Sequence, residues 1–272
     1  MLQTVAHPEV ELSLRERASA FLHTARSLPP YVVMAALFPG DHVPFSSLPF
    51  SLKEAYDFHT GLLARPGFGA MLDRLEREDL LTLPSMLASA PFDLLRIRRK
   101  FRDGTVRLPV TPPDDFPYPS YYLNDFHNQK NGNLSLQAAL TYEWQISVLF
   151  LGCNRLMRQA VIDPIPVGDQ LQILDVACGT AAWIPQARLQ GRGHAITAVD
   201  LSPTYLRYAR LAQRLGFRDN TRFLQMNAES LCPPGESAEA WSNRYDIVTC
   251  IWLLHELPRP AIERMLAELA RV

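Results

Sequence analysis

The sequence predicts an α/β protein in which a mainly helical N-terminal part precedes a parallel β-sheet. Between residues 171 and 272, short apolar runs typical of buried strands alternate with amphipathic helical stretches, the pattern of a parallel sheet covered by helices. Between residues 12 and 101, apolar residues recur instead at helical spacing. A proline-laced stretch at residues 112–119 separates the two parts, because proline disfavours helix in itself and in the residue before it.

The composition is that of a globular protein without a strong charge bias. The chain has 272 residues, 47% of them hydrophobic and 20% charged, with a net charge of −1. No overall attraction to nucleic acid or to an anionic membrane follows from this balance. The longest apolar runs are too short to span a bilayer, and the first residues lack the pattern of a secretory signal. Four cysteines show no metal-type spacing, so we expect a cytoplasmic protein with no metal site.

Three regions are expected along the chain. Residues 1–111 form a helical N-terminal domain, residues 112–165 form a linker, a polar and aromatic segment and a helix, and residues 166–272 form the sheet domain. The segment reads YYLNDFHNQKNGNLS from Tyr121 to Ser135, a composition that suits the rim of a polar pocket. Tyr122 and His127 are therefore candidate lid residues over a ligand, and packing of the following helix onto the sheet is their alternative role.

The first predicted strand, Leu171–Val176, leads into a turn of small residues at 177–180 and then into a helix expected over Ala181–Gln190. A strand that enters a helix through such a turn lets a ligand approach the backbone, and the helix start supplies free N–H groups. The turn lacks the pattern G-x-G-x-x-G, which disfavours a nicotinamide or flavin site.

The second predicted strand, Ala195–Val199, ends in Asp200, which lies 21 residues after Gly179 (200 − 179). At this place related folds put a carboxylate that accepts hydrogen bonds from ribose hydroxyls. Ser202-Pro203 then caps and opens a helix. We therefore predict a ribose-binding role for Asp200, with an ordinary surface aspartate as the alternative.

The third and fourth predicted strands are Arg222–Met226 and Ile247–Trp252. The near-continuous apolar character of the fourth indicates a central strand with both faces covered. His255 follows it by a few residues, at the edge where such sheets place their sites. Pro258 and Pro260 begin the last predicted helix.

Three stretches together resemble class I S-adenosylmethionine (SAM) methyltransferases. LQILDVACGTAAW, at residues 171–183, resembles the family's motif I in the variant of ubiquinone/menaquinone-methyltransferase-like members. AVDLSPTYL, at 198–206, resembles the second motif, and YDIVTCIWLLHEL, at 245–257, the fourth-strand motif. The segment ahead of the sheet resembles that of cyanobacterial and plastid-type relatives. The resemblance implies a Rossmann-like SAM-binding sheet.

The resemblance also implies SAM as the cofactor and a set of residues that bind it. These residues are Asp175, Ala177, Cys178, Gly179, Thr180, Asp200, Leu201, Asn227, Ala228 and Tyr122. The sequence departs from the family pattern where Ala177 and Ala181 replace glycines and where Asn227 replaces an aspartate. The Asn227 carbonyl oxygen can still accept the hydrogen bond from the adenine amino group, without the charge.

The function that follows is transfer of a methyl group from SAM to a small-molecule acceptor, with quinols and phenols as candidate acceptors. A general base is needed only if the acceptor loses a proton, and His255 and His127 are the candidates. The alternative is a non-catalytic or truncated SAM-binding scaffold, which the two alanines in the turn favour. The acceptor and the oligomeric state stay open.

Relatives continue beyond the final ELARV with three more strands, in the sheet order 3-2-1-4-5-7-6. By resemblance, the chain is therefore expected to be a piece of a longer protein, cut after the fourth strand. The fourth strand would then expose an apolar edge, and we expect self-association through it.

Overall fold

The computed structural model describes residues 13–26, 48–65, 67–71, 109–125, 131–150, 153–216 and 221–272. The chain divides into two compact units, one of residues 1–81 with 143–161 and one of residues 82–142 with 162–272. The segment predicted as a linker thus belongs to the same unit as the sheet. Of the stretch with helical spacing between residues 12 and 101, residues 72–101 lie outside the described residues.

The first unit contains helices held together by buried polar contacts. Its elements are α1 (Leu14–Arg26), α3 (Leu48–Leu63), the second half of α6 (Leu136–Leu149) and nearly all of α7 (Asn154–Ile162). Between α1 and α3, Thr24 Oγ1 lies 3.0 Å from His59 Nδ1. Between α6 and α7, Arg158 donates two hydrogen bonds of 2.7 and 2.9 Å to the Glu143 carboxylate. The helical pattern expected between residues 12 and 101 is confirmed at α1 and α3.

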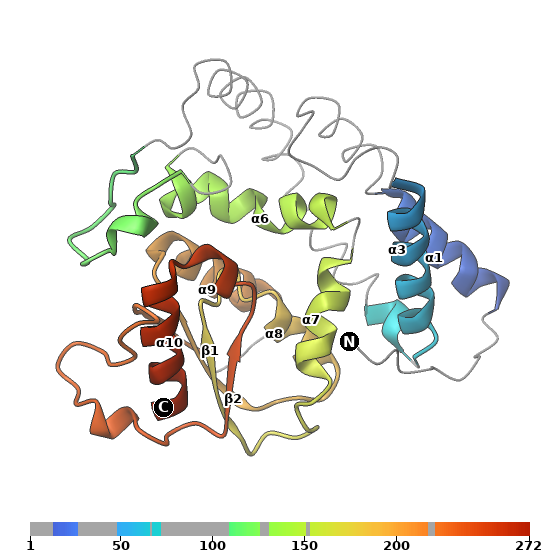
Figure 1. Ribbon diagram of the computed structural model, residues 1–272. Coiled ribbons are helices and arrows are strands. Elements are labelled where there is room, and N and C mark those ends of the chain that lie inside the picture. The colour runs from blue at the N-terminus through green and yellow to red at the C-terminus, as the bar shows by residue number, and fades with distance from the viewer. Residues whose placement is uncertain are drawn as a thin grey trace. The chain divides into compact units, whose positions relative to one another are not determined.

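The second unit is organised around a parallel four-stranded sheet, as predicted (Figure 1). The strands are β1 (Gln172–Val176), β2 (Ala195–Asp200), β3 (Arg222–Gln225) and β4 (Ile247–Cys250), in the order β3-β2-β1-β4. The register aligns Val176 with both Val199 and Cys250. The carboxyl ends of the neighbouring strands β2, β1 and β4 therefore lie at the same edge of the sheet.

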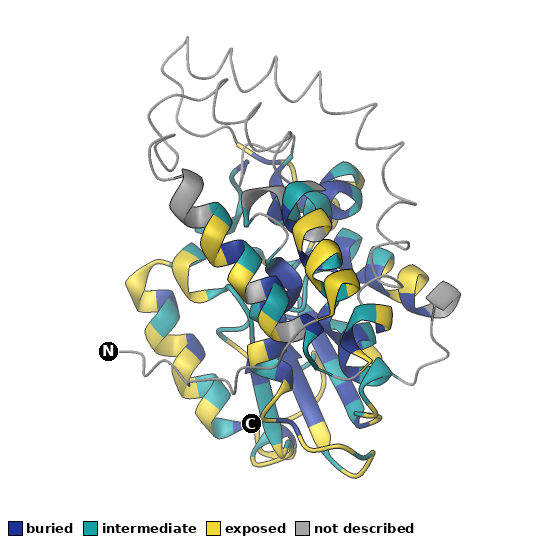
Figure 2. Ribbon diagram, turned by 90° about the vertical axis from the view of Figure 1, so that its right-hand side faces the viewer, coloured by how far each residue is buried: buried dark blue, intermediate teal, exposed yellow. Residues whose placement is uncertain are grey.

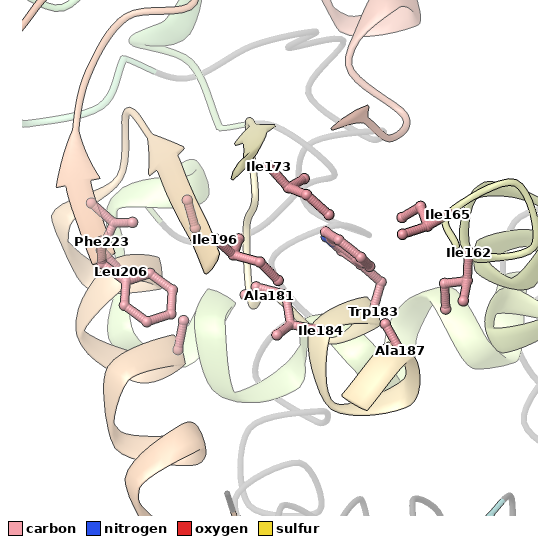
Figure 3. Close-up of a cluster of buried hydrophobic side chains, with 12 residues drawn as sticks. Ile162, Ile165, Ile173, Ala181, Trp183, Ile184, Ala187, Ile196, Leu206 and Phe223 are labelled. Atoms are coloured by element: carbon pink, nitrogen blue, oxygen red, sulfur yellow. The ribbon is translucent and has the colours of Figure 1, made fainter. Parts of the chain in front are cut away.

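Helices cover both faces of the sheet. On one face lie α8 (Trp183–Leu189) and α9 (Pro203–Gly216), and on the other lies α10 (Arg259–Arg271) (Figure 1). The face covered by α8 and α9 carries a cluster of buried hydrophobic side chains. Ile173 of β1 belongs to this cluster, in which Trp183 lies between Ile165 and Ile173 (Figure 3). The next residue, Leu174, packs on the opposite face. This alternation follows from the two-residue period of a strand. Figure 2 shows buried residues within the sheet, and in β1 every residue except Gln172 is buried.

Several predicted boundaries differ by one or two residues from those of the structure, and two of these differences have a reason in the backbone conformation. The helix expected from Ala181 begins at Trp183, because Ala181 has a φ of 54° and lies in the left-handed region. The fourth strand ends at Cys250 instead of Trp252, since Trp252 has a φ of 61°. β3 likewise ends one residue early, at Gln225.

Four short 3₁₀ helices complete the described residues. They are η2 (Ser120–Tyr122), η4 (Gly132–Leu134), η5 (Glu239–Trp241) and η6 (Leu254–Glu256). In the described part of the chain, no helix combines the length and apolar character needed to cross a membrane.

Candidate functional site

The candidate site lies where the connections of the sheet change direction. β2 and β3 lie on one side of β1, and the chain then crosses to β4 on the other side. Open parallel sheets bind ligands outside the carboxyl ends of the strands at such a switch point. Here the switch point falls between β1 and β4, and the turn at residues 177–180 follows β1 directly.

Left-handed conformations alternate through this turn. Ala177, Gly179 and Ala181 have φ angles of 56°, 53° and 54°, a conformation that costs an L-residue about 1–2 kcal/mol. The Cys178 N–H donates to the Val199 carbonyl of β2 over 3.0 Å, which fixes the turn against the neighbouring strand. A Cβ at Gly179 would lie 3.9 Å from the Tyr205 ring, an ordinary contact, so the backbone angle and not crowding by the protein favours glycine there.

Asp200 connects the turn to the helix that follows β2. Its Oδ2 accepts a 2.8 Å hydrogen bond from the Gly179 N–H, and its Oδ1 accepts one of 2.8 Å from the Ser202 N–H. Burial raises the pKa of Asp200 above its ordinary value, although these N–H groups and that of Leu201 act in the opposite direction. The predicted ribose-binding carboxylate is therefore held in a fixed position beside the turn.

Asp175, predicted to bind the cofactor, lies beneath the turn with only 1% of its surface exposed. Its carboxylate accepts hydrogen bonds from Trp183 Nε1 over 2.7 Å and from Thr249 Oγ1 over 2.8 Å. It thereby joins the start of α8 and strand β4 to β1. The structure thus gives Asp175 a supporting role, and its direct contact with a cofactor stays a prediction. Thr180 is also buried, at 5% exposure.

Cys178 is the turn residue with a titratable side chain. Burial, and then the nearby carboxylates of Asp200 and Asp175, raise the pKa of its thiol well above the ordinary value. The thiol is therefore neutral, and it contributes packing to the turn instead of acting as a nucleophile. Leu201, predicted to line the site, accepts a 3.1 Å hydrogen bond at its carbonyl from Gln225 Nε2.

The loop after β3 is organised by Asn227 and Glu229. Asn227 Oδ1 accepts the Glu229 N–H over 3.0 Å, and Ala228 between them packs against the core on the α10 face. Burial raises the pKa of Glu229, but hydrogen bonds from Tyr121, Arg264 and Asn227 outweigh it, so the pKa lies below its ordinary value. Glu229 is therefore a charged, fixed carboxylate next to the predicted adenine-binding residues.

The segment ahead of the sheet lies against the same edge. Burial and the charge of Asp200 raise the pKa of Tyr122, and Asn133 hydrogen-bonds to its side chain. The Tyr118 and Tyr122 rings are parallel within 5°, with centroids 5.9 Å apart. Ser202 Oγ donates a 2.6 Å hydrogen bond to the Asn133 carbonyl. Tyr122 is thus placed beside Asp200, whereas His127 lies outside the described residues.

His255 lies in η6, beyond the carboxyl end of β4. Its side chain is 64% exposed, and Nε2 lies 3.0 Å from Glu256 Oε1. Between β4 and η6, Trp252 adopts its left-handed conformation, which is unusual for a bulky residue. The histidine is accessible at the correct edge of the sheet, and its catalytic role stays a prediction.

Sequence reasoning missed Tyr118, Gln225 and Glu229 at this edge, and it placed Tyr121 in the polar segment without identifying its partner. Gln225 and Glu229 end or follow a strand at its carboxyl end, which is the signal that identified Asp200. The contacts of the two tyrosines carry no local signal, because Tyr121 and its partner Glu229 are 108 residues apart in the chain.

A family model described as a methyltransferase domain matches residues 173–272. Over these residues, the chain is similar to a methyltransferase domain. The match begins in β1 and includes the turn, Asp200 and β4. SAM is the cofactor of such domains, and the residues at the strand ends fit it, since Asp200 presents a carboxylate beside a turn with an open glycine.

Curated relatives of the methyltransferase domain act in quinone biosynthesis, according to their names. A ubiquinone biosynthesis O-methyltransferase of Pseudomonas fluorescens is 33% identical over 90 residues, which cover 33% of this chain and 35% of the relative. A ubiquinone/menaquinone biosynthesis C-methyltransferase of Psychromonas ingrahamii is 26% identical over 136 residues, covering 49% of this chain and 51% of the relative. The chain thus spans between about a third and half of the length of these relatives.

Among solved structures, a SAM-dependent methyltransferase from Aquifex aeolicus is similar at 23% identity with a TM-score of 0.34, covering 43% of this chain and 60% of the other. The magnesium protoporphyrin IX methyltransferase from Synechocystis PCC 6803, solved with bound SAH, has 18% identity and a TM-score of 0.35. The match covers 44% of this chain and 51% of the other.

Proposed function

We propose that this chain binds SAM at the carboxyl ends of β1, β2 and β3 and transfers the methyl group to a small-molecule acceptor. The observation that carries this proposal is the hydrogen bond from the Gly179 N–H to the Asp200 carboxylate. It holds a ribose-binding group next to a turn whose backbone is open to a ligand. The relatives' names support quinols and phenols as the first acceptors to test.

Each residue has a distinct role in this proposal. Asp200 accepts hydrogen bonds from the ribose hydroxyls, and the turn around Gly179 admits the methionine part of SAM. Asn227 and Ala228 face the adenine. When bound, SAM supplies a methyl group on a sulfonium for in-line displacement, so holding donor and acceptor in line is the protein's main contribution. His255 takes a proton from an acceptor hydroxyl where the reaction requires it.

Calorimetric titration with SAM tests the binding step. The unmodified chain should bind, and Asp200→Ala should bind at least about tenfold more weakly, because charge-assisted hydrogen bonds contribute about 1.5–3 kcal/mol each. Asp246→Ala is the matched control, since its carboxylate also accepts a backbone N–H, that of Gln172 over 2.7 Å, but at the opposite end of β1. Equal loss of affinity in both variants, or none in Asp200→Ala, would refute the assignment.

Product formation tests the catalytic step. The chain is incubated with SAM and a panel of quinols and phenols, and methylated product is measured by mass spectrometry. Product with one acceptor class supports a methyltransferase. SAM binding without product from any acceptor would instead support the alternative, a non-catalytic SAM-binding scaffold.

A further inference from the structure

The Glu229 carboxylate joins three segments that are far apart in the sequence. Glu229 follows β3, and its side chain is 8% exposed. It accepts a hydrogen bond of 2.5 Å from the Tyr121 hydroxyl of η2. It also accepts one of 2.7 Å from Arg264 Nε of α10 and forms an ion pair with the same guanidinium. Hydrogen bonds to a charged acceptor are roughly twice as strong as neutral ones. The loop after β3 thereby holds the segment ahead of the sheet.

Tyr121 lies in the middle of the segment that faces Asp200. Its neighbour Tyr122 lies next to Asp200, close enough for the aspartate charge to raise the pKa of its hydroxyl. Tyr118, stacked on Tyr122, donates a 2.8 Å hydrogen bond to Asp114 and accepts one of 2.9 Å from Gln225 Nε2. Hydrogen bonds thus attach the segment to the sheet domain at the end of β3, at Glu229 and, through Ser202, at the start of α9. Among these contacts, the one at Glu229 uses a charged side chain of the sheet domain.

We propose that Glu229 is a positioning residue for the cofactor: it holds Tyr121, and through it the Tyr118–Tyr122 pair, against the Asp200 edge without touching the cofactor itself. This inference rests on the proposed function, because it assumes that SAM binds at Asp200. A purely structural role for Glu229 would lower thermal stability and leave SAM affinity unchanged in the folded protein. A positioning role lowers the affinity at temperatures where the protein is fully folded.

The test compares Glu229→Gln, Tyr121→Phe and the double variant with the unmodified chain. SAM affinity is measured by calorimetry well below the melting temperature, and circular dichroism confirms folding. Each single variant should bind SAM about fivefold more weakly, the difference between a charge-assisted and a neutral or absent hydrogen bond. The double variant should lose little more than the larger single loss, because both changes remove the same contact. Glu263→Gln, which removes an exposed carboxylate paired with Arg259 on α10, is the matched control and should bind normally.

Hydrogen exchange without SAM gives a readout independent of binding. The N–H groups of Tyr122 and Leu123, bonded to the carbonyls of Pro119 and Ser120, should exchange faster in Glu229→Gln. Failure of the unmodified chain to bind SAM would refute the proposed function, and this inference with it. Normal binding by the unmodified chain and by both single variants, or additive losses in the double variant, would refute the inference about Glu229 alone.

Discussion

The alanines of the turn provide a stability prediction that tests the backbone of the site directly. Ala177 and Ala181 adopt φ angles of 56° and 54°, where the family pattern has glycine. The left-handed conformation costs an alanine about 1–2 kcal/mol, and glycine avoids this cost. Glycine also has the more flexible unfolded chain, which offsets about 0.4–1 kcal/mol of the gain. Ala177→Gly should therefore stabilise the fold by about 0.5–1 kcal/mol.

The two positions differ in the burial of the methyl group. Ala177 is only partly buried, whereas Ala181 is 1% exposed and packs in the cluster with Trp183 and Ile184. Removing a buried methyl group costs about 0.8 kcal/mol, so Ala181→Gly should leave stability nearly unchanged. We therefore expect a higher free energy of unfolding for Ala177→Gly than for the unmodified chain, and an unchanged one for Ala181→Gly.

Thermal unfolding followed by circular dichroism measures this difference. A gain of about 0.5–1 kcal/mol corresponds to a rise in melting temperature of about 1–4 °C for a chain of this size. Ala212→Gly is the control of opposite sign, because Ala212 is exposed inside α9, where glycine costs about 1 kcal/mol. If Ala177→Gly destabilised the protein as much as Ala212→Gly, Ala177 would not be left-handed in solution and the derived turn geometry would be wrong.

The remaining predictions concern the turn, the tyrosine segment and the sheet edge. Gly179→Val should abolish SAM binding in calorimetry, because its side chain would occupy the ligand's space or, at a φ of 53°, would shift the backbone of the turn; normal binding would place the ligand elsewhere. Tyr122→Ala combined with His127→Ala should weaken SAM binding more than it lowers the melting temperature, and the reverse ranking would indicate a packing role. β4 is an end strand of the described sheet, so light scattering should show self-association through its edge, and a monodisperse monomer would contradict this.

The fold of the sheet domain could be predicted because its strands are short, mainly apolar and separated by helices, of which α9 begins at the cap predicted for Ser202. Strands of a parallel sheet are covered on both faces, so a short run of mainly apolar residues is enough to predict one. The run from Ile173 to Val176 predicts β1 in this way. The errors occurred at Ala181 and Trp252, where the backbone turns left-handed. Hydrophobic pattern does not reveal such conformations, because alanine and tryptophan normally avoid them. The family pattern has glycine where this chain has Ala181, and glycine adopts positive φ readily. That difference was the sequence signal for a left-handed residue at this position.

The polar contacts of the site could be predicted only where they are local. Spacing along the chain identified Asp200 because the connection from β1 to β2 has a typical length. The contact between Tyr121 and Glu229 joins residues 108 positions apart, so its formation depends on how the segment ahead of the sheet folds onto β3. Asp175 shows the converse case: its position in the motif predicted ligand contact, which stays a prediction, but no sequence signal predicted its hydrogen bonds with Trp183 and Thr249.

The electrostatics of Asp200 provide a prediction for the pH dependence of the proposed SAM binding. Because burial raises its pKa, the ionised form costs the folded protein free energy above the raised pKa, and this cost is relieved as the pH falls through that value. The N–H groups of Gly179 and Ser202 offset the cost only in part. A ligand with two hydroxyl donors would complete the hydrogen bonding of the ionised carboxylate and lower its pKa. SAM affinity should therefore weaken as the pH falls and Asp200 becomes protonated. Over the same pH range, the destabilisation of the free protein by ionised Asp200 should disappear.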